Sequence, residues 1–273
     1  MVAKGLPFTP NQVTVFHAML AVGASLGIAI ADRRWFWLVF IVMELRAVLD
    51  CYDGVLARGK KISSPYGRTV DELSDAVGYI ALNVGIAYRV WHESHNGYTF
   101  LLMCVVLGSG GLQAWSHDFY KRKFTAALTH GRDSVVPDLR PKYQLIQRGE
   151  ADFIVKFGLF FDTMQVKVLS RRSAKETLRQ MRDADSPIVS EDVPHILAHA
   201  DTFFIRVVMR TLGIMTGDNG FIILTVGVLL GSLWEAQLVT AAWGVLSLGA
   251  TILMMNAFLS KERAHGSKER AHG

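Results

Sequence analysis

Six long apolar blocks limit what this chain can fold into more strongly than any other feature of its sequence. They span residues 12–31, 35–49, 76–91, 99–115, 221–234 and 237–259. A helix needs about 20 mostly apolar residues to cross the hydrocarbon core of a bilayer, and most of these blocks reach that length once their flanks are included. The sequence therefore predicts an all-α, multi-pass integral membrane protein with six transmembrane helices.

Short polar segments separate the first four blocks, and we expect residues 1–117 to carry the first four membrane helices. Their expected positions are 11–31, 34–52, 68–91 and 98–117. Residues 201–259 are expected to supply helices 5 and 6. A third span in this last region is an alternative, but it would place the Lys/Arg-rich tail outside, against the rule that basic loops stay in the cytoplasm.

One long polar insertion, residues 118–200, separates helices 4 and 5. A lengthened loop explains this insertion better than a small cap over a site. The basic run Lys121 to Lys123 near its start is interpreted as an anchor attracted to anionic lipid at the membrane surface. The tail, residues 260–273, repeats SKERAHG and is predicted to be disordered.

The distribution of charge indicates which side of the membrane these segments face. The chain has a formal net charge of +5, and its basic residues lie mainly in the 58–68 connection, the insertion and the tail. That bias is typical of cytoplasmic loops, so we expect the insertion and the carboxylates described next to face the cytoplasm. The sequence has no basic groove interleaved with aromatic residues, which argues against a nucleic-acid partner.

Four aspartates stand at the edges of two apolar blocks, where carboxylates are costly. Asp50 and Asp53 are three residues apart near the end of helix 2, while Asp71 and Asp75 are four apart near the start of helix 3. These spacings put each pair on one helix face, and a hairpin between the helices would bring the two faces together. Four carboxylates at such close range would repel one another, and a divalent cation, or a pair of them, removes that cost.

The residue types around the aspartates indicate which ion and which ligand would bind. Oxygen ligands without His or Cys favour Mg²⁺ or Mn²⁺ over zinc. Four carboxylates suffice for a two-metal site that clamps a phosphoryl centre, with the ions about 3.5–4 Å apart. Gly54 and Ala57 on the carboxylate face would let a phosphate or a base approach the backbone closely, and Arg58 could donate paired hydrogen bonds to a phosphate.

Three other interpretations of the aspartates compete with this one. They could be solvated helix-end acids facing Lys60, Lys61 and Arg68, although four on two matched faces is unusual for that role. A membrane transporter or ion-binding protein could use intramembrane carboxylates, but it would more naturally repeat them in the second half of the chain. A prenyl-transferring enzyme normally carries DDxxD clusters, which this sequence lacks.

The sequence also fills, without a miss, the pattern D-x2-D-G-x2-A-R-x8-G-x3-D-x3-D. The residues at its fixed positions are Asp50, Asp53, Gly54, Ala57, Arg58, Gly67, Asp71 and Asp75. This pattern resembles the signature of the class I CDP-alcohol phosphotransferases (CDP-alcohol phosphatidyltransferases), membrane enzymes of phospholipid synthesis. The resemblance covers residues 1–116, and the long insertion departs from the compact members of that family.

The resemblance implies a role for each matching residue. The four aspartates would hold two Mg²⁺ or Mn²⁺ ions, and Asp75 would also be the catalytic general base. The CDP group would be bound by Gly54, Ala57, Arg58 and Gly67. The implied reaction moves a phosphatidyl-type group from a CDP-linked lipid in the bilayer, with CDP-diacylglycerol as the expected donor, to an alcohol acceptor, and releases CMP.

Residues outside the motif give weaker signals. The stretch TPNQVT at 9–14 resembles the start of helix 1 in this family, so Asn11 and Thr14 are expected to line the nucleotide pocket, with an ordinary N-cap turn as an equal alternative. Arg206 resembles an arginine at the start of the family's helix 5 that binds a phosphorylated acceptor in some members. His17, one turn beyond Thr14, is interpreted as a packing residue. The acceptor alcohol and the oligomeric state stay open, a homodimer being one candidate.

Overall fold

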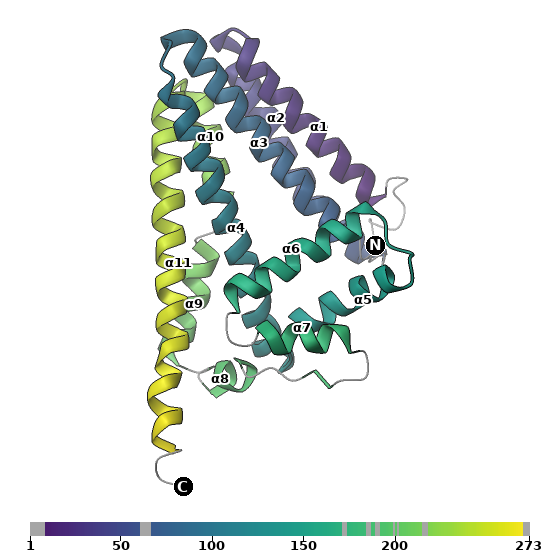
Figure 1. Cartoon of the computed structure of the whole chain (residues 1–273). Coiled ribbons are helices and arrows are strands. Elements are labelled where there is room, and N and C mark those ends of the chain that lie inside the picture. Colours follow the sequence, from purple (N-terminus) through teal and green to yellow (C-terminus); the bar gives the residue numbers. More distant parts are fainter. Residues whose placement is uncertain are drawn as a thin grey trace. The chain divides into compact units, whose positions relative to one another are not determined.

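The structure is a computed structural model that describes residues 9–60, 67–170, 174–183, 187–188, 192–198, 200, 202–214 and 218–269. Among these residues the regular elements are helices and none is a strand, which confirms the all-α prediction. The elements, labelled in Figure 1, are α1 (Pro10–Ile30), η2 (Arg33–Trp35), α2 (Phe36–Lys60), α3 (Gly67–Ser94), α4 (Tyr98–His130), α5 (Val135–Gln147), α6 (Phe153–Leu169), α7 (Ala174–Arg182), α8 (Asp192–Ala198), α9 (Phe203–Ile214), α10 (Asp218–Leu230) and α11 (Leu233–Glu269).

Local sequence signals fix the start of α1 but not the ends of the helices that follow. Thr9 caps α1 through a capping box, because its hydroxyl accepts from the Gln12 backbone N–H while the Gln12 side chain accepts from the Thr9 N–H. Helix α2 continues to Lys60 rather than ending near residue 52, so the first half of the aspartate motif is helical.

Helix α11 is helical to Glu269, beyond the point where the disordered tail was expected to begin. The tail sequence is rich in Lys, Glu, Arg and Ala, which favour helix.

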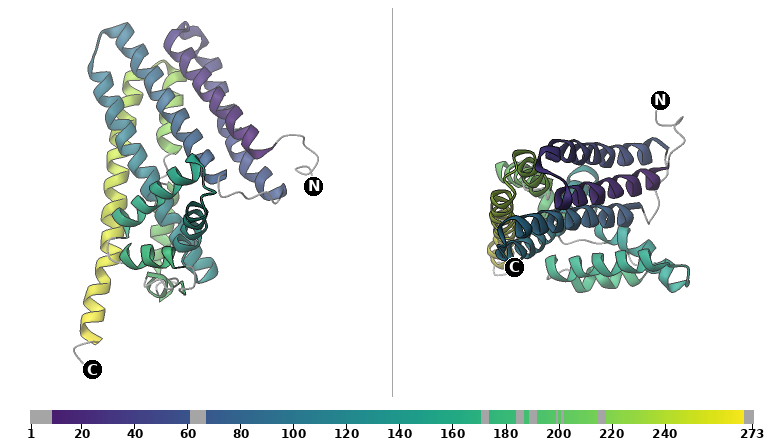
Figure 2. Two further views of the ribbon diagram at one scale, coloured as in Figure 1. Left: turned by 45° about the vertical axis from the view of Figure 1, so that its right-hand side comes forward. Right: turned by 90° about the horizontal axis from the view of Figure 1, so that it is seen from above.

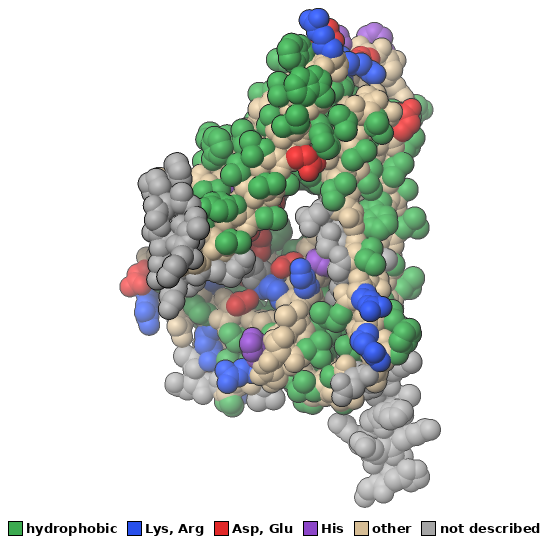
Figure 3. Space-filling model, turned by 180° about the vertical axis from the view of Figure 1, so that it is seen from behind, with side chains coloured by type: hydrophobic (Ala, Val, Ile, Leu, Met, Phe, Trp, Pro, Cys, Tyr) green, Lys and Arg blue, Asp and Glu red, His purple; other side chains and the backbone are tan. Residues whose placement is uncertain are grey.

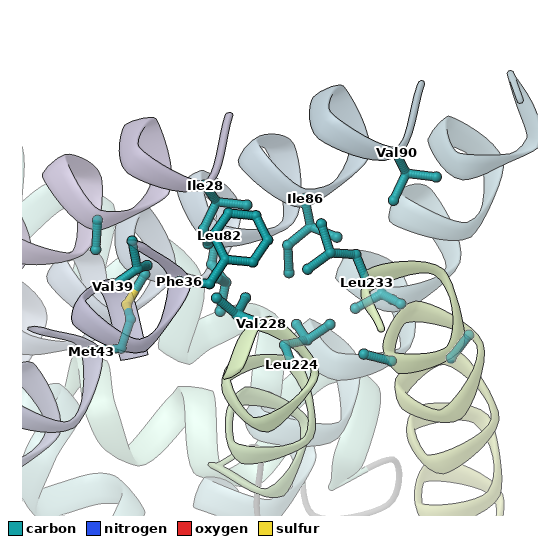
Figure 4. Packing of buried hydrophobic residues seen from close by; sticks show 14 residues of the cluster. Ile28, Phe36, Val39, Met43, Leu82, Ile86, Val90, Leu224, Val228 and Leu233 are labelled. Carbon is teal, nitrogen blue, oxygen red and sulfur yellow. The ribbon is translucent and has the colours of Figure 1, made fainter. Parts of the chain in front are cut away.

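The chain forms two compact units, and the first comprises Met1–Gly111 and Asp218–Gly244. Within this unit α1 packs against α2 and α3, and α10 packs against α2. Both views in Figure 2 show α1, α2 and α3 running side by side. Their shared core contains Ile28, Phe36, Leu82 and Ile86, all almost fully buried, together with Leu224 from α10 (Figure 4). This packing fixes the register of the three helices that carry the aspartates and the residues around them.

The second unit comprises Leu112–Gly217 and Val245–Gly273. Residues of the predicted loop form helices in this unit, and α5, α6 and α7 pack on one another. One cluster of buried residues joins Phe119 of α4 to Leu139, Leu159 and Met181 of these three helices. A second cluster joins the end of α4 to α8, α9 and α11. The interpretation of residues 118–200 as a lengthened loop is therefore wrong, because their apolar residues recur at helical spacing and supply a core despite the polar average.

Two ion pairs in the second unit are largely shielded from solvent. The ammonium of Lys142 donates to Oδ2 of Asp162 at 2.7 Å, and both side chains are buried. Lys123 is likewise buried and pairs with Asp192. Lys123 is thus an internal partner rather than part of a membrane-surface anchor, because a buried lysine requires a nearby carboxylate to stay charged.

Three of the described helical segments are long and apolar enough to cross a membrane: Pro10–Ile30, Tyr98–His130 and Leu233–Met255. Asn219–Leu230 is apolar but shorter. Helices α2 and α3 carry the motif carboxylates, which lower their mean hydropathy, so the six-span topology stays a prediction. Large apolar side chains are exposed along the helices of both units, and hydrophobic side chains cover much of the face drawn in Figure 3.

Candidate metal centre

Helices α1, α2 and α3 bring one histidine and three aspartates to a single point. His17 of α1, Asp50 and Asp53 of α2, and Asp71 of α3 each offer one ligand atom, and these atoms all lie within 4.8 Å of one another. The spacing of three residues places Asp50 and Asp53 on the same face of α2. The expected meeting of the carboxylate-bearing helix faces is thus observed for three of the four aspartates.

Polar groups of α1 and α3 orient this cluster. The hydroxyl of Thr14 donates to Oδ2 of Asp53 at 2.6 Å, and Asp53 is buried. Ser74 of α3 donates in turn to the backbone carbonyl of Thr14 at 3.2 Å. Hydrogen bonds of this kind hold a ligating carboxylate in one rotamer, so the first helix helps to shape the site.

His17 is a candidate metal ligand that the sequence interpretation did not include. Its side chain is fully buried, and Nε2 lies 3.5 Å from Oδ1 of Asp50 and 3.4 Å from Oδ2 of Asp53. Only the packing of α1 against α2 brings the ring to these carboxylates. One feature of the sequence could have indicated this role. His17 follows Thr14 by three residues, which puts both on the same face of α1, close to the polar start of the helix.

The bonding state of the cluster fits a divalent cation. Neither ring nitrogen of His17 has a hydrogen-bond partner among the described residues, and the same holds for the buried Oδ1 of Asp71. Buried polar atoms without partners are costly, and a cation bound among the carboxylates would satisfy Nε2 of His17 and Oδ1 of Asp71. Three carboxylates and one imidazole form a donor set whose oxygen majority favours Mg²⁺ or Mn²⁺.

Asp75 lies one turn beyond Asp71 on α3 and stands apart from the four-residue group. Its carboxylate pairs with the guanidinium of Arg46 from α2. Arg46 is buried, and its guanidinium carbon lies 5.0 Å from the centre of the Phe221 ring. The ion pair with Arg46 therefore directs the Asp75 carboxylate toward α2.

The remaining predicted site residues are distributed as follows. Gly54 is half-buried in α2 next to Asp53, and Asn11 is exposed in the first turn of α1. Ala57 and Arg58 belong to the last turns of α2, with side chains outside the described part of the structure, and Gly67 is the first residue of α3. Arg206 is exposed on α9, in the second unit.

A family model matches the N-terminal part of the chain. Residues 8–127 match the model of a family described as CDP-alcohol phosphatidyltransferase, a range that includes the whole aspartate motif and the three helices of the metal centre. No curated protein and no solved structure matches the chain.

Proposed function

We propose that the protein moves a phosphatidyl-type group from a CDP-linked lipid to an acceptor hydroxyl and releases CMP, because residues 8–127 match the model of the CDP-alcohol phosphatidyltransferase family. The family itself implies transfer of a phosphatidyl group from a CDP-alcohol. The observation that carries the proposal is the convergence of His17, Asp50, Asp53 and Asp71 within the matched segment. Such a cluster suits the binding of metal ions that neutralise a diphosphate.

We assign the metal ligands from the residues present. Asp50, Asp53 and Asp71 would hold Mg²⁺ or Mn²⁺ with His17 beside them, and Asp75 would complete a second metal position. Bound there, the metal supplies positive charge that stabilises the diphosphate and acidifies a nearby hydroxyl. Thr14 keeps the Asp53 carboxylate directed into the cluster through its hydrogen bond.

The other motif residues are proposed to bind the nucleotide and move the proton. Arg58 pairs with a phosphate, the small residues Gly54, Ala57 and Gly67 bind the CDP group at close range, and Asn11 lines the nucleotide pocket. Asp75 accepts the proton of the acceptor hydroxyl as its oxygen attacks the lipid-bearing phosphorus. The bond from that phosphorus to the oxygen bridging it to CMP then breaks, and CMP leaves with the bonding electrons.

The donor and its surroundings follow from the chemistry. The three long apolar helices and the family match together indicate an integral membrane protein, and a lipid donor such as CDP-diacylglycerol would reach the site from the bilayer. We propose that the site faces the cytoplasm, where the CDP-linked donor and a water-soluble alcohol meet. Arg206 is the candidate contact for a phosphorylated acceptor.

Release of CMP tests the proposal. Purified protein is incubated with CDP-diacylglycerol, Mn²⁺ and one alcohol at a time, from a panel of glycerol phosphate, inositol, inositol phosphate and serine. A separate reaction supplies diacylglycerol with a CDP-linked head group. We expect acceptor-dependent CMP release with one of these pairs and loss of it in Asp53→Asn. A well-folded protein that releases no CMP with any pair, under conditions in which it binds Mn²⁺, would contradict the proposed reaction.

A further inference from the structure

Helix α6 buries two polar side chains among apolar ones and exposes a row of aromatic and aliphatic side chains, unlike an ordinary amphipathic helix in a soluble protein. The buried side carries Asp162, which accepts from Lys142, and Gln165. The side chain of Gln165 accepts from Arg122 at 3.1 Å and donates to the Trp115 carbonyl at 3.1 Å. Because these polar groups have partners inside the second unit, the orientation of α6 is fixed.

The outward side of α6 is a continuous aromatic and aliphatic strip. Its exposed members include Phe153 at 76% exposure and Phe160 at 60%. The others are Phe161, Met164 and Val168. The Phe157 ring lies 6.0 Å from that of Phe153 and 5.1 Å from that of Phe161, so the strip has no polar break along its centre. The spacings of three and four residues place all of these side chains on one face, and an exposed patch of this kind marks an interaction surface.

A basic hollow borders this apolar strip. Lys156 and Lys167 lie on one edge of the exposed face of α6, and with Arg182 of α7 they line a hollow of about 320 Å³. The hydroxyl-bearing residues Thr163 and Tyr143 also line it, and its apolar wall includes Phe160 and Leu159, Leu178 and Met181. None of the three cations forms a salt bridge with any residue that the structure describes.

We propose that α6 lies in the headgroup region of the bilayer, with its aromatic strip toward the acyl chains and an anionic phospholipid headgroup in the basic hollow. Phe side chains on one face and Lys on its border are the composition of interfacial helices, and lysines at such an edge reach toward headgroups while their stems cover apolar surface. Three cations that form no salt bridge with a described residue complement a phosphate. The bilayer is the occupant because the same chain contains helices that can cross it. This inference is independent of the transferase activity.

Collision accessibility of spin labels tests the depth of the strip in the full-length protein. Cys51 and Cys104 are replaced by serine, and nitroxides are attached to Phe160→Cys, Met164→Cys and, as a control, Lys175→Cys, which is exposed on α7. The protein is reconstituted in phosphatidylcholine and phosphatidylglycerol vesicles. We expect labels at 160 and 164 to be accessible to oxygen and protected from an aqueous nickel chelate, and the label at 175 to show the opposite.

Two results would overturn the placement of α6. Access of the chelate to positions 160 and 164 comparable with that at position 175 would put the strip in water. Protection of both positions from oxygen as well as from the chelate would mean that protein, rather than lipid, covers the strip.

The headgroup part is tested with spin-labelled lipids. We expect the wild-type protein to immobilise labelled phosphatidylglycerol in preference to labelled phosphatidylcholine, and removal of each lysine in Lys156→Gln and Lys167→Gln to weaken that preference about fivefold. Lys175→Gln should leave it unchanged. An unchanged preference in both hollow variants would remove the headgroup site. Competition by inorganic phosphate equal to that of unlabelled phosphatidylglycerol would show a free-phosphate site and overturn the lipid assignment.

Discussion

The hydroxyl of Thr14 donates a 2.6 Å hydrogen bond to Oδ2 of Asp53 and so connects the first helix to a carboxylate of the second. Both residues are buried, and Thr14 lies one turn before His17 on the same helix face. Helix α1 therefore contributes side chains to the candidate metal centre. The bond also explains why a threonine stands at this position near the start of an apolar helix.

Replacing Thr14 by valine tests this connection. The substitution keeps the shape of the side chain and removes only the donor, so we expect Mn²⁺ affinity and turnover to fall roughly 10–100-fold, as for other groups that orient a metal ligand. Isothermal titration with Mn²⁺ measures the change. Thr225→Val is the matched control, since Thr225 is also buried in an apolar helix and its hydroxyl donates to a backbone carbonyl of the same helix, that of Ile222, rather than to a cluster carboxylate. Equal affinities of the two variants would remove Thr14 from the site.

His17→Leu tests whether the imidazole contributes to metal binding. Both ring nitrogens lack hydrogen-bond partners among the described residues while Nε2 faces two carboxylates. We expect the leucine variant to bind Mn²⁺ roughly 10–100-fold more weakly, and His17→Gln, which keeps a polar atom near the same position, to lose less. Electron paramagnetic resonance of free Mn²⁺ gives both affinities. Wild-type affinity in the folded leucine variant would return His17 to a packing role.

The spacing of the aspartates predicted most of this site, whereas its partners from distant parts of the chain were not predictable in the same way. Helical periodicity alone puts Asp50 and Asp53 on one face. Asp71 comes close to them because α2 and α3 both pack against α1. The placement of His17 depends on how α1 packs against α2, which no local pattern encodes. The pairing of Asp75 with Arg46 could have been predicted, because Arg46 is a lone arginine in an apolar block and needs an acidic partner.

The fold of residues 118–200 was missed for a different physical reason. The polar average of the segment conceals short helices that each contribute a few side chains to a common core, such as Leu139 and Leu159. Lys142 and Asp162 look like surface residues in the sequence, yet they pair in the interior. Composition records neither the helical spacing of the apolar residues nor the pairing of opposite charges.

The ion pairs of Glu93 can be tested through the pH dependence of stability. Glu93 lies beyond residue 91, the predicted end of the third membrane span. Arg33 donates to its carboxylate from η2 and lowers the pKa of Glu93, with a further contribution from Arg89 and opposition from partial burial. Because the folded pKa is below the unfolded value of about 4.3, this stabilisation is present above that value and is lost as the pH falls through the folded pKa.

Glu93→Gln should therefore lower the Tm most near neutral pH, by a few degrees, since partly exposed pairs contribute about 0.2–1 kcal/mol. The Tm difference from the wild type should shrink as the pH falls below about 4.3 and at high salt. Thermal unfolding in detergent across this pH range measures it. A difference that stays constant with pH would show that the ion pairs contribute nothing.

Asp75→Asn separates proton transfer from metal binding. As the proposed general base, Asp75 should matter mainly to turnover, so we expect CMP release to fall roughly 10²–10⁴-fold while CDP affinity in the presence of Mn²⁺ changes little. Calorimetric titration with CDP, set beside the rate, decides between the roles. A loss of CDP affinity in proportion to the rate would assign Asp75 to the second metal and remove it as the base.

Carboxylates from α2 and α3 are proposed to bind jointly the metal on which transfer depends, and a Mn²⁺ titration of Asp71→Asn tests this most directly. Asp71 is the member of the cluster that α3 supplies. The control is Glu72→Gln, which makes the same carboxylate-to-amide change at the adjacent, exposed position. We predict that Asp71→Asn loses Mn²⁺ binding and CMP release together while Glu72→Gln keeps both. Wild-type Mn²⁺ affinity in Asp71→Asn would contradict the account.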